Sequence, residues 1–130
     1  MARVAVVTGG TRGIGEAISL AMKKAGYRVA ATYAGNDAAA QKFQAESWIP
    51  VYKFDVGDYD ACEKAIAQIT RDLGPVDVLV NNAGITRDAA LHRMTRAYWT
   101  DVIRTNLDSA FNMTRLVIDI MRSLNFGRII

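Results

Sequence analysis

Short apolar runs alternate along the chain with longer segments in which apolar residues recur at helical spacing. The runs predict strands at residues 3–7, 28–33, 50–54 and 76–80, and the start of a fifth strand at 127–130. The helical pattern covers residues 14–22, 38–47, 62–73 and 95–123, and we expect the last helix to be broken near 105–108. Strands that alternate with helices in this way form βαβ units. The pattern therefore predicts an α/β fold with a parallel sheet wound on both faces, of about four strands plus the beginning of a fifth.

The composition narrows the class of protein but does not indicate a catalytic or binding site. A chain of 130 residues, 51% hydrophobic and 22% charged, suits one globular domain. The net charge of +3 is spread along the chain, whereas a nucleic-acid binder gathers its basic residues into a stripe. No apolar run approaches the roughly 20 residues that span a bilayer, and the first ten residues do not resemble a signal peptide. We expect a cytoplasmic protein that binds neither nucleic acid nor membrane.

The first strand runs into the glycine-rich loop T-G-G-T-R-G-I-G at residues 8–15. A phosphate site is expected between a first strand and a first helix of this kind. Gly9 would permit the tight turn, Gly13 would let a pyrophosphate approach the backbone, and Gly15 would let helix and strand pack closely. Amide groups at the helix N-terminus would attract the anion. The loop therefore favours a dinucleotide-binding fold of the Rossmann type.

Two other interpretations of the loop are weaker. Gly10 and Gly15 have the spacing of a Walker A loop, but Glu16 stands where the phosphate-binding lysine belongs. A glycine-rich turn without a ligand is the second alternative. The position of the loop between strand and helix argues against it.

The residues after the second strand indicate which nucleotide is preferred. Folds that prefer NAD usually end this strand with an acid that binds the adenosine ribose. Here residues 32–35 contain no acid, and the first one is Asp37. Arg12 can meet a 2′-phosphate as a charge-assisted partner. We therefore expect NADP(H) as the cofactor.

Other chemistry has little support in the sequence. His92 is the only histidine, and the acids of residues 55–60 lack the spacing of a calcium loop. Asp58 or Asp60 is better explained as a helix N-cap, and Cys62 as a core residue. We expect no metal site.

With the loop at residues 8–15 and the motif N-N-A-G at 81–84, the chain resembles the short-chain dehydrogenases/reductases along essentially its whole length. The resemblance implies that Asp55 and Val56 contact the adenine ring and that Asn106 belongs to the catalytic tetrad. Combined with the loop, it gives the expected cofactor-binding residues Gly9, Arg12, Gly13, Ile14, Gly15, Tyr33, Asp55, Val56, Asn82, Ala83, Gly84, Ile85 and Thr86.

Within this family, the segments N-N-A-G-I-T-R-D-A-A-L-H-R-M-T, V-I-R-T-N-L-D-S-A-F-N-M-T-R and F-G-R-I-I are similar to acetoacetyl-CoA reductases of polyhydroxybutyrate synthesis. The 3-oxoacyl-[acyl-carrier-protein] reductases share much of this and remain an alternative. The resemblance implies NADPH-dependent reduction of acetoacetyl-CoA to (R)-3-hydroxybutyryl-CoA by a homotetramer. It also implies that Asp88 lies beside the substrate, although an acid in a surface loop is an equal explanation.

The resemblance places a catalytic serine at the end of the fifth strand and Tyr-x-x-x-Lys on the next helix. The chain reaches neither, and none of its five tyrosines is followed four positions later by lysine. We therefore expect residues 1–130 to be the NADP-binding, N-terminal portion of a single-domain enzyme, inactive as it stands. A nucleotide-binding module without chemistry and an interaction protein are the alternatives.

Overall fold

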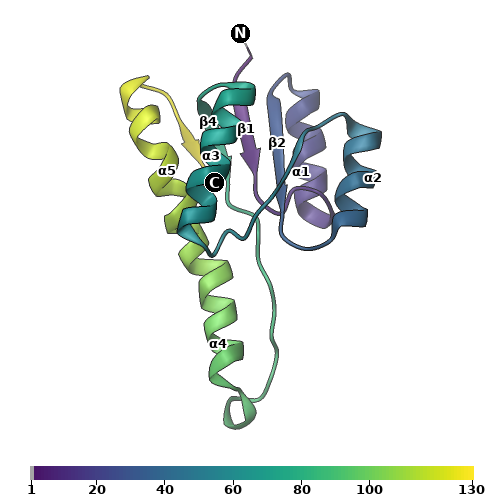
Figure 1. The fold of residues 1–130 in the computed structure, drawn as a ribbon, viewed down its shortest axis with the longest axis vertical. Coiled ribbons are helices and arrows are strands. Elements are labelled where there is room, and N and C mark those ends of the chain that lie inside the picture. The colour runs from purple at the N-terminus through teal and green to yellow at the C-terminus, as the bar shows by residue number, and fades with distance from the viewer. Residues whose placement is uncertain (1) are drawn as a thin grey trace.

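A computed structural model describes residues 2–130 (Figure 1). Its strands are β1 (Val4–Val7), β2 (Arg28–Tyr33), β3 (Val51–Lys53), β4 (Val76–Val80) and β5 (Arg128–Ile129). Its helices are α1 (Gly13–Lys24), α2 (Asp37–Ser47), α3 (Tyr59–Leu73), α4 (Arg96–Ile103) and α5 (Ser109–Ser123), with a 3-10 turn η1 (Leu91–Arg93) and a π-helical segment η2 (Arg104–Asp108). Each strand and helix that the sequence predicted is present.

The five strands form one sheet in the order β3-β2-β1-β4-β5, and all neighbouring pairs are parallel. The chain builds outward from β1 to β3, then crosses back to place β4 on the other side of β1. Parallel α/β sheets bind ligands where the strand order reverses, outside the carboxyl ends of the strands. The topology therefore points to the space beyond the ends of β1 and β4.

Both faces of the sheet are covered by helices. Helices α3 and α5 lie on one face, with Val6 and Leu79 packed in the same cluster as Ile69 and Met113 (Figure 1). The other face carries α1 and α2, and its core cluster consists of Ala5, Val7, Val29, Ala31, Phe43, Ile49, Val78 and Val80. Alternate residues of β1 thus enter different cores, which explains why that strand is apolar throughout. The predicted doubly wound α/β fold is confirmed.

The break expected near residues 105–108 takes the form of the π-helical segment η2 and does not end the helix. Figure 1 shows α4, η2 and α5 as one continuous helical run. The amide of Ser109 donates to the carbonyl of Arg104, five residues back, so hydrogen bonding continues through a π turn. A π turn inserts one extra residue and rotates the apolar face, which looks like an interruption in a pattern of period 3.6.

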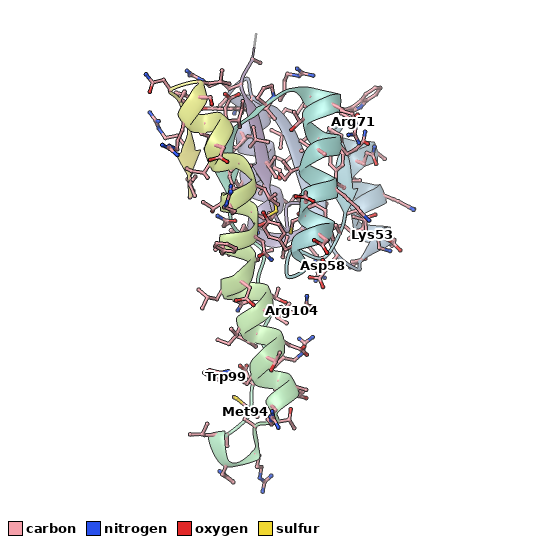
Figure 2. All side chains as sticks on the ribbon, turned by 60° about the vertical axis from the view of Figure 1, so that its left-hand side comes forward. Lys53, Asp58, Arg71, Met94, Trp99 and Arg104 are labelled. Carbon is pink, nitrogen blue, oxygen red and sulfur yellow. The ribbon has the colours of Figure 1, made fainter. Side chains whose placement is uncertain are left out.

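Helix α4 and the segment after β4 extend beyond the sheet as an arm, with η1 at its tip (Figure 1). The aromatic side chains of Tyr98 and Trp99 on α4 are exposed, and Figure 2 shows Trp99 well away from the sheet. Despite the length of the α4–α5 run, none of the helices described for residues 2–130 is both long and apolar enough to cross a bilayer.

Candidate functional site

A cleft of about 650 Å³ opens at the carboxyl ends of the strands, where the topology predicts a ligand site. Its wall is formed by the glycine loop, the β2–α2 turn, the end of β3, the segment after β4 and the start of η2. Of the expected cofactor-binding residues it gathers all but one: Gly9, Arg12, Gly13, Ile14, Gly15, Tyr33, Asp55, Val56, Asn82, Ala83, Gly84 and Ile85. Thr86 and Asp88 are exposed on the same segment, outside the lining of the cleft.

The glycines of the loop are needed for different structural reasons. Gly9 and Gly13 have φ values of +60° and +58°, in the left-handed region that favours glycine. A Cβ on Gly13 would meet no atom within 4 Å, so the space beside it is open, as the approach of a pyrophosphate requires. A Cβ on Gly9 would lie 3.1 Å from the Cα of Ala83, so Gly9 also allows the segment after β4 to come close.

Close packing of helix and strand depends on Gly10 rather than on Gly15, contrary to expectation. A Cβ on Gly10 would lie 2.7 Å from the carbonyl oxygen of Val7 and 2.8 Å from Oγ of Ser19 on α1, and that hydroxyl donates to the Gly10 carbonyl. A Cβ on Gly15 would instead lie 1.9 Å from the carbonyl oxygen of Gly9. Gly15 therefore lets α1 begin against the turn itself.

The start of α1 offers unbonded donors to the cleft. Glu16 is the first residue of the helix whose amide bonds back into the turn, to the carbonyl of Arg12 at 3.1 Å. Within residues 2–130, the amides of Gly13, Ile14 and Gly15 have no hydrogen-bond partner, as geometry dictates for a first helical turn. Arg12 occupies the N-cap position without a side-chain capping bond. Free amides and a guanidinium beside open space fit the phosphates of a dinucleotide.

Thr8, which sequence reasoning did not select, ties the two loops of the cleft together. Its side chain is 2% exposed, and its Oγ1 accepts hydrogen bonds from the amides of Asn82 and Ala83, each at 3.0 Å. The side-chain amide of Asn82 returns two bonds, to the carbonyls of Thr8 at 3.1 Å and Gly9 at 3.2 Å. The glycine loop and the segment after β4 are thus held as one unit. The place of Thr8 at the end of a buried strand and at the start of the glycine-rich loop was the sequence signal that could have found it.

Asn106 lies in the π-helical segment and bonds across to the segment after β4. Its Oδ1 accepts from the amide of Ile85 at 2.8 Å, and its Nδ2 donates to the Ile85 carbonyl at 2.9 Å. The side chain thereby satisfies both backbone groups of Ile85, as a neighbouring strand would. Asn106 positions a residue of the cleft lining rather than forming part of the lining itself.

Asp55 lines the cleft at the end of β3, but both of its oxygens are already bonded. Oδ2 lies 2.7 Å from the guanidinium of Arg104 in η2, and Oδ1 accepts from the amide of Gly57 at 2.8 Å. Partial burial acts to raise the pKa of Asp55, but the bonds from Arg104 and Gly57 outweigh it, and the pKa lies below its ordinary value.

The sequence analysis did not identify four residues that line the cleft beyond the N-N-A-G motif: Arg87, Asp101, Arg104 and Thr105.

Loss of the Asp55–Arg104 pair should change the pH dependence of stability. Because the folded-state pKa of Asp55 is lowered, the pair stabilises the fold above the unfolded pKa of about 3.9 and loses this effect as pH falls through the folded value. Arg104→Met should cost under about 1 kcal/mol at pH 7, since both side chains are partly exposed, and less near pH 3. Urea unfolding at both pH values measures this.

Arg115→Met serves as a control, since it breaks an exposed helical pair with Asp119 and should change stability by no more than about 0.5 kcal/mol. An Arg104→Met penalty of equal size at pH 7 and pH 3 would contradict the assignment.

The side chains considered for metal binding have structural roles. Asp58 caps α3 by accepting from the amide of Ala61, as expected for one of the two candidate caps. The thiol of Cys62 is fully buried and points to the Val56 carbonyl at 3.3 Å. Burial, together with the charges of Asp55 and Asp58, raises its pKa to about 12. Within residues 2–130, no three His, Cys, Asp or Glu side chains gather as a ligand set.

A glycine loop that presents free amides at the reversal point of a parallel sheet defines the class of dinucleotide-binding α/β proteins. Comparison with known families narrows this class. The family model for short chain dehydrogenase matches residues 3–130, and the chain belongs to that family. A nicotinamide cofactor is the ligand that this family implies, and the cleft fits it.

Curated relatives are similar over the whole chain. Acetoacetyl-CoA reductases from Shinella zoogloeoides and Rhizobium meliloti (strain 1021) are 62% and 61% identical to it over 130 residues, which is 100% of this chain and 54% of each relative. A 3-oxoacyl-[acyl-carrier-protein] reductase from Mycobacterium avium is 42% identical over 130 residues, with 48% of that protein covered. The chain thus spans about half the length of the curated relatives it matches.

Proposed function

We propose that the complete gene product reduces acetoacetyl-CoA to (R)-3-hydroxybutyryl-CoA with NADPH. The observation that carries this proposal is the cleft, in which unbonded amides of α1 and the Arg12 side chain stand beside the open space at Gly13. The relatives above 60% identity support a CoA thioester, because the acyl-carrier-protein reductase is less similar at 42%. Residues 1–130 would supply the NADP-binding portion of a single domain.

The cofactor, when bound, supplies the hydride, and residues of this chain hold it in place. Amides of Gly13 and Ile14 would bind the pyrophosphate, and Val56 would contact the adenine ring. Ile85, whose backbone is fixed by Asn106, would support the nicotinamide end. Asn106 would also serve the catalytic tetrad from this position, and Asp88 would meet the substrate. A cytoplasmic homotetramer completes the proposal.

The preference for NADPH should depend on Arg12. The end of β2 carries no acid, and Tyr33, Ala34, Gly35 and Asn36 line the cleft there. Arg12→Gln should weaken NADPH binding by about tenfold or more and leave NADH binding nearly unchanged, because only NADPH carries the 2′-phosphate that a guanidinium would bind. Titration of nicotinamide fluorescence with each cofactor measures both constants.

Arg71→Gln is the matched control, since Arg71 lies near the far end of α3, away from the cleft (Figure 2). It should leave both constants unchanged. If Arg12→Gln weakened NADPH and NADH equally, Arg12 would have a general role and the NADP preference would need another source.

The substrate is tested on the complete gene product with acetoacetyl-CoA and with acetoacetyl-[acyl-carrier protein]. Preferred turnover of the CoA thioester supports the proposal. Preferred turnover of the carrier-protein thioester assigns the protein to fatty acid synthesis instead. Cofactor binding without turnover of either would indicate a nucleotide-binding module.

A further inference from the structure

An ion pair at the rim of the cleft contains a carboxylate whose charge would affect the proposed cofactor. Asp37, the first residue of α2, is the first acid after β2. Nζ of Lys53 lies 3.0 Å from its Oδ1 and 3.2 Å from its Oδ2. Lys53 is the last residue of β3 and pairs in register with Tyr33, the last residue of β2. The sheet therefore sets the lysine beside the β2–α2 turn.

The pair borders the part of the cleft where the adenosine ribose is expected. Asn36 directly precedes Asp37 and caps α2, Phe54 directly follows Lys53, and both line the cleft. Arg12 lines the same cleft. Lys53 is labelled in Figure 2 at the end of the body from which the arm extends. An unbalanced charge on Asp37 would thus act near any group on the ribose 2′ position.

This ion pair contributes little to the stability of the fold, so its role must lie elsewhere. The side chains of Lys53 and Asp37 are 52% and 53% exposed, and pairs this exposed contribute little to folding. The hydrogen bond and charge of Asp37 raise the pKa of Lys53, so the lysine is charged throughout the neutral range. The consequence of the pair is electrostatic: it removes the net negative charge that Asp37 would otherwise place at the rim.

We propose that Lys53 is a specificity-determining residue that favours the binding of NADPH by neutralising Asp37. Without Lys53, the Asp37 carboxylate would repel a 2′-phosphate and partly cancel the attraction of Arg12. NADH carries a hydroxyl at that position and would not be affected. This inference rests on the proposed binding of NADPH in the cleft, and it assigns a role to two residues that do not line the cleft.

Lys53→Met in the complete gene product tests the inference. The dissociation constant for NADPH should rise about threefold at an ionic strength near 0.01 M, where the Debye length is about 30 Å, and the effect should shrink at 1 M salt. The constant for NADH should stay the same. Adding Asp37→Asn to Lys53→Met should restore NADPH binding, because the repelling charge is then gone. Lys53→Arg should bind both cofactors like the unaltered protein.

Lys24→Met is the control, since Lys24 ends α1 at the opposite end from the glycine loop. It should change neither constant. A Lys53→Met protein with an unchanged ratio of the two constants, or an equal loss for both cofactors, would overturn the role of Lys53. Failure of the unaltered protein to bind either cofactor would overturn the proposed function instead, so the two outcomes are distinct.

Discussion

Gly15→Ala should greatly weaken cofactor binding and destabilise the fold. The new Cβ would lie 1.9 Å from the carbonyl oxygen of Gly9 and 2.6 Å from Nδ2 of Asn82. The first of these atoms is backbone and cannot rotate away, so the loop and the start of α1 must separate. We expect a loss of about 2–4 kcal/mol in the free energy of unfolding, in the range of severe overpacking. The affinity for NADPH should fall by about 100-fold or more, since the amides would no longer converge on the phosphates.

Gly35→Ala provides a control within the same cleft. Gly35 also lines the cleft, but a Cβ there would meet no atom within 4 Å and its φ is not in the left-handed region. It should change stability by no more than about 0.5 kcal/mol and NADPH affinity by less than about twofold. Denaturant unfolding and fluorescence titration of both variants make the comparison. Near-native binding by Gly15→Ala would show that the loop adapts and that its rigid geometry is not what binds the cofactor.

The sequence was sufficient to predict the parts of the site that are local. The buried strand β1 is a continuous apolar run, and β4 is apolar except for Asp77. The loops that follow them, residues 8–15 and 81–84, contribute many of the residues that line the cleft. Because parallel strands end at the same edge of a sheet, the fold brings these two loops together without further information.

The parts that could not be predicted depend on contacts between distant segments. Arg104 reaches Asp55 across 49 positions of sequence, and the charges of its helix have the pattern of an ordinary solvated surface. The π turn decides which residues of this helix face the cleft, since one extra residue rotates everything beyond it. Lys53 lies next to Asp37 only because of the register between β2 and β3.

Thr8→Val should have the second large effect, although it changes few atoms. The hydroxyl accepts from the amides of Asn82 and Ala83, and valine would leave both without this acceptor. The Val80 carbonyl keeps its bond from the Thr8 amide and also accepts from the Asn82 amide, each at 3.1 Å, so the loss falls on the Ala83 amide. For one unsatisfied buried amide, we expect about 1–3 kcal/mol of destabilisation. NADPH affinity should also fall by about tenfold, since the two loops of the cleft lose part of their connection.

Thr8→Ser separates hydrogen bonding from packing. Serine keeps the hydroxyl and removes only the methyl group, so it should cost about 1 kcal/mol from lost burial and bind NADPH almost normally. Valine fills the space of threonine, so a loss confined to the valine variant must come from the amides. If the serine variant lost as much stability as the valine variant, packing of the Thr8 methyl group would hold the two loops together. In that case the hydroxyl would not be the link between the end of β1 and the segment after β4.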